Sequence, residues 1–306
     1  MKIKIKREWA KNTHVSKKWF KKGTLAKHRL YFYWSDKKEF PCDKYGFRLP
    51  SNLQNFEDRY TNDKNKKIFC FGGSTTWGQF CEYKNTYPFY LEKLLNNDVS
   101  VYNFGGCDSD ARTQIYILID LLRKKYNPDL VLFLDGINEK TAWLNKINNL
   151  EYNETNLHYN YFNFLNSNFA LYYKFKEFIK FSIKKSIEGG LPLKSEGIDP
   201  MTYVSELSSS YLNSINLVDK LKEVFKFKFF SFLQPIVYDI IENNPDRYLH
   251  IKGFYNNIKL SRYKNIIDIS KSTNLVKENF IDWQHLDGDG NKKIAETIFE
   301  KIKNEI

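Results

Sequence analysis

Apolar residues in the middle of the chain form short blocks that alternate with longer amphipathic stretches. Ile68–Phe71, Val99–Phe104 and Leu130–Leu134 are compact apolar runs with the length of buried strands. Between them, Tyr87–Leu95 and Thr113–Tyr126 place apolar residues at helical spacing. Strands that alternate with helices of this length are typical of βαβ units, so this part of the chain predicts a parallel sheet.

The same alternation resumes in the last third of the chain. Val204–Val224 has a helical pattern and is followed by a candidate strand at Phe227–Leu233. Asn265–Ile269 is a further candidate strand, and Asn291–Ile306 is a candidate final helix. The complete pattern predicts five parallel strands flanked by helices, an open three-layer α/β/α sandwich. In such sheets, ligands bind at the carboxyl ends of the strands.

A stretch rich in asparagine and aromatic residues, at about 140–205, interrupts the alternation. It contains an amphipathic segment, Phe169–Ile187, whose lysines argue against a membrane-spanning helix. A lid, a partner-binding surface and a helix laid over the edge of the sheet are all compatible with this pattern. We therefore expect a basic, aromatic-rich N-terminal extension over residues 1–60, and one α/β domain over residues 61–306 that carries the insertion.

The positive charge of the chain is concentrated near its N-terminus. The net charge of the 306 residues is +12, and residues 1–40 contain thirteen Lys and Arg but only three acidic residues. Aromatic side chains such as Trp9, Trp19 and Trp34 are interleaved with these cations. This composition suits an anionic partner such as a membrane surface, an acidic glycan or a nucleic acid. The alternative is a solvated extension that packs on the domain through its aromatic residues.

The expected compartment is the cytoplasm, with a peripheral membrane contact as an alternative. The four cysteines show no CxxC spacing, and a chain of this length does not need disulfide bonds to fold. No run of eighteen uncharged apolar residues occurs, and the N-terminus lacks the apolar segment of a signal peptide. The body of the chain is nearly neutral and carries no nucleic-acid-binding motif, so we expect no nucleic-acid partner.

Candidate chemistry lies where the predicted strands end. Gly72-Gly73-Ser74 follows the first strand, where glycines permit a tight turn and a serine can be either a nucleophile or the cap of the next helix. Gly105 and Gly106 follow the second strand and can direct an N–H into a cleft, or can simply form a turn. Asn138 follows the third strand, and its amide can either face the same cleft or bond to its own turn.

The histidine with an acidic residue at helical spacing is His285. Asp282 lies three residues earlier and can bond to Nδ1–H, which leaves Nε2 as a general base. A surface ion pair between the two is the alternative interpretation. A serine, a glycine N–H, an asparagine amide and an Asp-x-x-His pair at successive strand ends are the groups that acyl transfer requires: a nucleophile, oxyanion donors, a base and an orienting acid.

These segments resemble the SGNH superfamily, also called GDSL-type esterases and lipases, over roughly residues 66–306. FGGSTTWG is similar to block I of the bacterial branch that reads GGS, and NFGG is similar to block II. DGINE is similar to block III, with Glu139 in place of the usual aspartate. DWQHLDGDGNKKIA is similar to block V. The segments YGFR, upstream of block I, and FLQP, at the fourth strand end, also look like stretches of this branch.

The resemblance implies a flavodoxin-like α/β fold, no metal and no organic cofactor. Carried over to this sequence, it makes Ser74 the nucleophile, His285 the base and Asp282 the orienting acid. The implied oxyanion hole consists of the N–H of Ser74, the N–H of Gly105 and the side chain of Asn138. Gly106 is an alternative to Gly105, because the doubled glycine leaves the alignment ambiguous by one position.

The implied activity is hydrolysis of a carboxylic ester through a Ser-His-Asp triad and an acyl-enzyme. The expected substrate is a small-molecule or glycan ester, with an O-acetyl group on a carbohydrate favoured over a lipid ester. A sugar O-acyltransferase would use the same triad and pass the acyl group to an alcohol. A non-catalytic glycan- or membrane-binding module is a rival from another class, and it predicts no reaction with a serine-directed phosphonate.

Overall fold

The structure is a computed structural model of the chain. It describes residues 24–28, 31–35, 42–43, 45–50, 52–96, 98–107, 109–139, 200–240, 249–259 and 263–306. Most of the predicted insertion and most of the basic N-terminal region, including Phe169–Ile187 and the tryptophans at 9 and 19, lie outside these residues.

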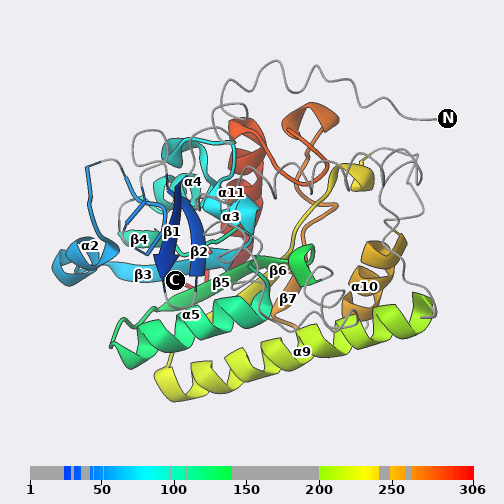
Figure 1. The fold of residues 1–306 in the computed structure, drawn as a ribbon, viewed down its shortest axis with the longest axis horizontal. Helices are drawn as coiled ribbons and strands as arrows, with labels where there is room; N and C mark the ends of the chain where they lie inside the picture. The colour runs from blue at the N-terminus through cyan, green and yellow to red at the C-terminus, as the bar shows by residue number, and fades with distance from the viewer. Residues whose placement is uncertain are drawn as a thin grey trace, which may run out of the picture.

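Five parallel strands form the central sheet, as the sequence pattern predicts (Figure 1). They are β3 (Lys66–Gly72), β4 (Val99–Asn103), β5 (Leu130–Asp135), β6 (Lys228–Leu233) and β7 (Ile266–Asp268). Their order across the sheet is β4-β3-β5-β6-β7. β4 and β5 therefore lie on opposite sides of β3, and the strand order reverses between β3 and β5. In open α/β sheets, the crevice at such a point is the usual ligand site.

The register of the sheet aligns the strand ends that carry the candidate residues. Gly72 of β3 is paired with Leu134 of β5, which in turn is paired with Phe232 of β6. Every residue of β5 is buried, because helices cover both faces of a parallel sheet and leave no polar face. The loops that follow β3, β5 and β6 therefore begin at the same edge of the sheet.

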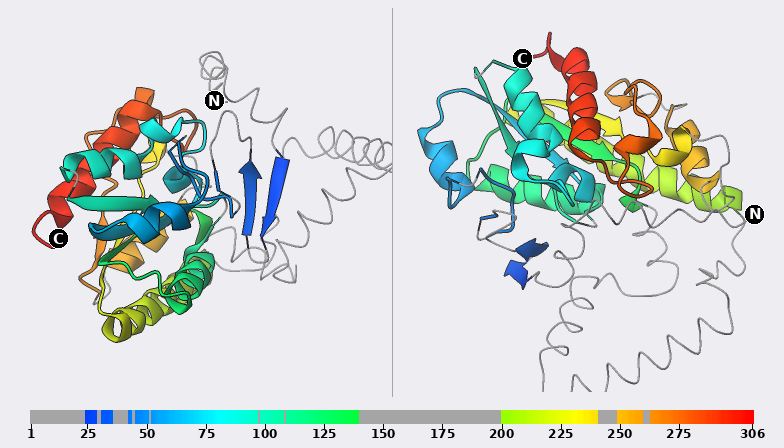
Figure 2. Two further views of the ribbon diagram at one scale, coloured as in Figure 1. Left: turned by 90° about the vertical axis from the view of Figure 1, so that its left-hand side faces the viewer. Right: turned by 90° about the horizontal axis from the view of Figure 1, so that it is seen from above.

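Helices cover the sheet on both sides, which completes the expected three layers (Figures 1 and 2). One layer contains α4 (Tyr87–Leu94) and α11 (Gly288–Ile302), which pack against each other. The other contains α5 (Ala111–Arg123), α9 (Pro200–Phe225) and α10 (Leu249–Lys259). The sequence pattern did not predict α10. Three short 3₁₀ turns lie at Tyr83–Asn85, Val237–Asp239 and Lys277–Asn279.

Aromatic side chains connect residues 45–62 to the sheet. The short helix α2 (Phe56–Asn62) was also not predicted, and its Phe56 is buried with its ring 5.3 Å from that of Phe104. Phe47 also contacts Phe104, with the ring centroids 4.7 Å apart, and contacts Phe56 at 5.7 Å. This end of the expected N-terminal extension thus belongs to the same hydrophobic core as β3 and β4. The domain boundary at residue 60 otherwise stays a prediction.

A separate antiparallel hairpin precedes this segment. It consists of β1 (Thr24–His28) and β2 (Tyr31–Ser35), with Thr24 opposite Ser35. The sequence pattern did not predict this hairpin. Among the described helices, none is both long enough and apolar enough to cross a membrane.

Candidate active site

Ser74 lies immediately after the first strand of the chain's parallel sheet, at the start of α3 (Ser74–Trp77). Gly72 has φ +154°, and a Cβ there would lie 2.0 Å from Oγ1 of Thr76 and 2.7 Å from the carbonyl oxygen of Leu134. Only glycine suits this position, because it needs both an unusual φ and a close approach of backbone. The N-cap of α3 is Gly73, and no side-chain capping bond is present. Ser74 is therefore not the helix cap that we considered as the alternative.

The Ser74 hydroxyl is hydrogen-bonded to His285 instead. Its Oγ lies 2.7 Å from Nε2 of His285, although the two residues are 211 positions apart in the sequence. Nδ1 of the same ring lies 2.6 Å from Oδ2 of Asp282. Ser74 and His285 are 7% and 5% exposed, so the serine and imidazole are largely shielded from water. The structure therefore brings the three predicted residues together as a chain of contacts, Ser74 to His285 to Asp282.

The tautomer of His285 follows from its partners. Burial opposes ionisation of Asp282, but hydrogen bonds and charge from His285, together with the N–H of Gln284, outweigh it and lower the pKa of this carboxyl. An ionised carboxylate can only accept hydrogen bonds, so Nδ1 carries the proton and Nε2 is free to accept from Ser74. This is the arrangement in which an imidazole acts as a general base towards a serine.

The loop that carries His285 is an irregular bend closed by a backbone hydrogen bond, and it is not the helical turn that the Asp-x-x-His spacing suggested. The N–H of Ile281 donates to the carbonyl of His285 at 2.8 Å, and Phe280 forms a bridge with Leu286. Oδ1 of Asp282 accepts the N–H of His285 at 2.8 Å. The side chain of Asp282 therefore fixes both the loop and the imidazole, because each of its oxygens has a different task.

The segment after α3 also contacts His285. The ring of Phe80 lies edge-on to the imidazole, with centroids 5.2 Å apart, and Phe80 has φ +70°. Sγ of Cys81 lies 3.2 Å from the carbonyl oxygen of Leu286. Burial raises the pKa of Cys81 to about 12, so the thiol stays protonated and can donate this hydrogen bond. Residues that follow α3 thus contact His285 and the residue after it.

Asn138 lies beside Gly73, the residue that precedes Ser74. Its Nδ2 donates to the carbonyl of Ser109 at 2.9 Å, and a Cβ added to Gly73 would lie 2.2 Å from the same nitrogen. The amide therefore occupies the space that the missing side chain of Gly73 leaves open. Since an asparagine NH₂ has two donors, one N–H of Asn138 remains for an acceptor near Ser74.

Both glycines considered as the third oxyanion donor use their N–H groups within the fold. Gly105 N–H donates to Oδ1 of Asn103 at 3.0 Å, and Gly106 N–H donates to the carbonyl of Gly72 at 3.0 Å. A Cβ on Gly105 would lie 2.4 Å from the backbone nitrogen of Trp77. Close packing against α3, rather than a free donor, is the feature of Gly105 that the structure shows.

Several residues that support the site were given no role from the sequence, although the NFGG and FLQP segments that contain two of them were noted. Nδ2 of Asn103 donates to the carbonyl of Thr76 at 2.8 Å and so ties the end of β4 to α3. Nε2 of Gln234, after β6, lies 3.0 Å from Oγ1 of Thr75 and 3.3 Å from the carbonyl of Gln284. Their positions at strand ends were the available signal, but the acceptors they reach are distant in sequence.

Arg48 is a further supporting residue, and it is almost fully buried. Its guanidinium lies over the ring of Trp77 at 4.5 Å and donates to the carbonyl of Cys81 at 2.9 Å. Nε1 of Trp77 donates to the carbonyl of Gly46 at 3.1 Å. The YGFR segment thus braces α3 and the residues that follow it. In the described part of the chain, no group of three or more His, Cys, Asp or Glu side chains is arranged to hold a metal ion.

The chain matches no known family model and no curated protein. It is similar to solved structures of esterases. They include an acetyl xylan esterase (16% identity; 77% of this chain and 99% of that chain covered; TM-score 0.47). Others are a lipolytic protein of the G-D-S-L family from Veillonella parvula (13%; 78% and 98%; 0.47) and a putative arylesterase from Agrobacterium tumefaciens (14%; 79% and 100%; 0.45).

Proposed function

We propose that this protein is a carboxylic ester hydrolase of the SGNH type, with Ser74 as nucleophile, His285 as general base and Asp282 as orienting acid. The proposal is supported above all by two hydrogen bonds to the same imidazole. Oγ of Ser74 lies 2.7 Å from Nε2 of His285, and Oδ2 of Asp282 lies 2.6 Å from Nδ1. A buried serine whose hydroxyl faces an oriented imidazole has the geometry of an activated nucleophile.

In the first half of the reaction, Oγ of Ser74 attacks the carbonyl carbon of the ester while Nε2 of His285 takes its proton. The carbonyl oxygen becomes a tetrahedral oxyanion, and Asp282 stabilises the imidazolium that forms. The intermediate collapses when His285 gives the proton to the departing alcohol, which leaves an acyl group on Ser74. In the second half, His285 activates a water molecule, and the acid is released.

The oxyanion donors in this proposal are the N–H of Ser74 and the side chain of Asn138. Ser74 is the first residue of α3, so its N–H has no acceptor one helical turn earlier. The role of the Asn138 side chain as a donor is supported by its position against Gly73, the residue before Ser74. Gly105, or its alternative Gly106, could join these donors only by giving up its present acceptor in the fold.

The acyl group and the alcohol of the substrate are proposed from the resemblance of the motifs alone. An O-acetyl group on a carbohydrate is the favoured substrate, and a lipid ester is the second choice. A sugar O-acyltransferase would use the same three residues, and adding an acceptor alcohol to the assay separates the two activities. Contact of residues 1–40 with an anionic surface stays a prediction, as does the cytoplasmic location.

The decisive experiment combines a fluorophosphonate probe with turnover of p-nitrophenyl acetate. We expect labelling at Ser74, and loss of both labelling and turnover in Ser74→Ala and His285→Ala. Ser205→Ala changes an exposed serine of α9 and serves as the matched control, with labelling and turnover unchanged. Full activity in Ser74→Ala would refute the proposal. Absence of labelling in the folded wild-type protein would favour the non-catalytic binding module instead.

A further inference from the structure

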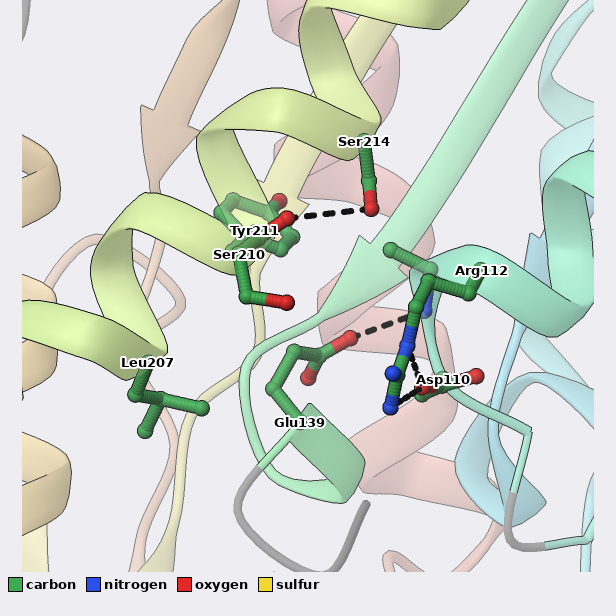
Figure 3. A pocket seen from close by; sticks show the side chains of 8 residues that line it. Asp110, Arg112, Glu139, Leu207, Ser210, Tyr211 and Ser214 are labelled. Atoms are coloured by element: carbon green, nitrogen blue, oxygen red, sulfur yellow. Dashed lines mark hydrogen bonds and ion pairs between the residues drawn. The ribbon is translucent and has the colours of Figure 1, made fainter. Parts of the chain in front are cut away.

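Glu139 connects two loops at the edge of the proposed oxyanion site. Its Oε2 accepts the N–H of Gly136 at 2.9 Å, within the loop that follows β5. Its Oε1 accepts the N–H of Ala111 at 3.0 Å, at the first residue of α5. Figure 3 shows this carboxylate between the start of α5 and the facing surface of α9, with its bond to α5 drawn as a dashed line. One buried side chain therefore holds the loop after β5 against the beginning of α5.

Asn138 crosses between the same two loops. It directly precedes Glu139, and its Nδ2 donates to the carbonyl of Ser109, two residues before Ala111. The place of this amide relative to Ser74 thus depends on how residues 136–139 are held against residues 109–111. Glu139 accepts the backbone N–H groups of both Gly136 and Ala111, and these two contacts hold the loop after β5 against the start of α5.

The surroundings of Glu139 are unfavourable to a negative charge, because the side chain is buried near two other buried carboxyl groups. Glu139, Asp135 and Asp110 are 6%, 4% and 3% exposed. Burial, and then the charge of Asp110, raise the pKa of Glu139 to about 7, although the N–H groups of Gly136 and Ala111 oppose this. Arg112 forms an ion pair with Asp110 at 2.9 Å and offsets part of the negative charge (Figure 3).

A neutral side chain of the same length would avoid this electrostatic penalty but could not make both contacts. Glutamine has one acceptor oxygen, and its NH₂ would face the second backbone N–H as another donor. Only a carboxylate accepts from Gly136 and Ala111 together. The bidentate contact is therefore the property of Glu139 that a glutamine variant removes.

We propose that Glu139 is a positioning residue: by bonding to Gly136 and Ala111, it holds the amide of Asn138 where that amide can donate to an oxyanion formed at Ser74. This inference rests on the function proposed above, and it gives Glu139 no proton transfer of its own. Its distinctive consequence is that Glu139 should influence catalysis only through Asn138.

The test is a double-mutant cycle with Glu139→Gln, Asn138→Ala and the two combined, assayed with p-nitrophenyl acetate and with the fluorophosphonate probe. We expect Asn138→Ala to lower kcat about a hundredfold or more, the usual effect of losing one oxyanion donor. Glu139→Gln should lower kcat roughly tenfold with KM nearly unchanged, because it misplaces a donor that acts in the transition state. The combined variant should be no slower than Asn138→Ala alone, because coupled residues are not additive.

Circular dichroism at the assay temperature shows whether each variant is folded. If Glu139→Gln does not fold, Glu139→Asp takes its place in the cycle, because it keeps the charge but is too short to span both N–H groups. Glu223→Gln, at an exposed position of α9, is the matched control and should leave kcat unchanged.

Two results would overturn the inference. One is a combined variant whose loss in kcat equals the product of the two single losses. The other is a folded Glu139 variant with the kcat of the wild type. Both leave the proposed function intact, since the wild type would still be labelled at Ser74; failure of labelling in the wild type would instead reject the esterase proposal itself.

Discussion

Replacing Gly73 with alanine places a methyl group where the amide nitrogen of Asn138 now lies. The added Cβ would be 2.2 Å from Nδ2 and 3.3 Å from Cγ of Asn138, and it would be 3.6 Å from the carbonyl oxygen of Ser109. Since non-bonded heavy atoms approach to about 3.5 Å, the amide has to retreat by about 1 Å. The clash involves the far end of a flexible side chain, so we expect Asn138 to move and the backbone to stay.

The expected effect on folding is small. Gly73 has an extended backbone with φ −78° and ψ −154°, and this negative φ does not require glycine. Loss of the bond from Asn138 to Ser109 costs about 1 kcal/mol, and replacing glycine by alanine in a compatible conformation returns about 0.4–1 kcal/mol. The free energy of unfolding of Gly73→Ala should therefore stay close to that of the wild type.

The expected effect on catalysis is large. A displaced oxyanion donor lowers the rate about a hundredfold to a thousandfold, equivalent to about 3–4 kcal/mol of transition-state stabilisation. The assay is kcat/KM for p-nitrophenyl acetate, with the thermal unfolding midpoint measured on the same samples. Gly72→Ala is the contrasting variant: its Cβ would meet the Leu134 carbonyl at φ +154°, so it should lose stability first.

Either of two results would refute this reasoning. A folded Gly73→Ala variant with activity within about threefold of the wild type would show that Asn138 is not an oxyanion donor, because a lost donor has a far larger effect. A Gly73→Ala variant as unstable as Gly72→Ala would show that the space beside Gly73 is closed by rigid backbone rather than by the Asn138 side chain.

Two further predictions concern carboxyl groups. Asp282→Asn keeps an acceptor for the N–H of His285 but no longer accepts a hydrogen bond from Nδ1. The value of kcat should therefore fall about a thousandfold to ten-thousandfold while the protein stays folded. A near-normal kcat would contradict the tautomer assigned to His285. Burial raises the pKa of Asp43 to about 7, against hydrogen bonds from the N–H of Phe47 and Tyr45, so the folded state binds an extra proton between about pH 4 and pH 7. The stability from this proton is present at low pH and lost as the pH rises through 7. Asp43→Asn should therefore raise the free energy of unfolding at pH 8 by up to about 4 kcal/mol, and by little at pH 4, as measured by urea denaturation; the same change at both pH values would contradict this.

The sheet, and Ser74, His285 and Asp282 as candidate site residues, could be predicted from the sequence because their signals are local. The five strands are short apolar runs between helical stretches, and each predicted strand overlaps an observed one within two residues at either end. The pairing of Asp282 with His285 depends on a spacing of three residues. That both lie opposite Ser74 follows only from the parallel order of the strands and from the motifs.

The features that we missed depend on contacts between distant segments. α2 has few apolar residues and is stabilised by aromatic contacts of Phe56 with Phe104, just after β4, and of Tyr60 with Phe69, whose ring centroids are 6.3 Å apart. α10 buries Ile251 and Phe254, but its interior glycine and asparagines weakened the helical pattern. The hydrogen-bond partner of Gly105 N–H could not be inferred either, because a glycine has the same sequence signal whether its N–H is free or engaged.

The separation of Ser74 from His285 has a consequence for the synthesis of this protein. At typical elongation rates of about 5–20 residues per second, the 211 residues from the one after Ser74 up to His285 take about 10–40 s to translate. During that time Ser74 and the strand before it can pack with β4 and β5, but its hydroxyl has no base. Contacts of such long range also form late in folding, since closing a long loop precedes the gain from the contact. If the proposed function is right, the nascent chain should be inert towards esters until residues beyond His285 have left the ribosome, and reaction with a phosphonate probe should report the completion of folding rather than its onset.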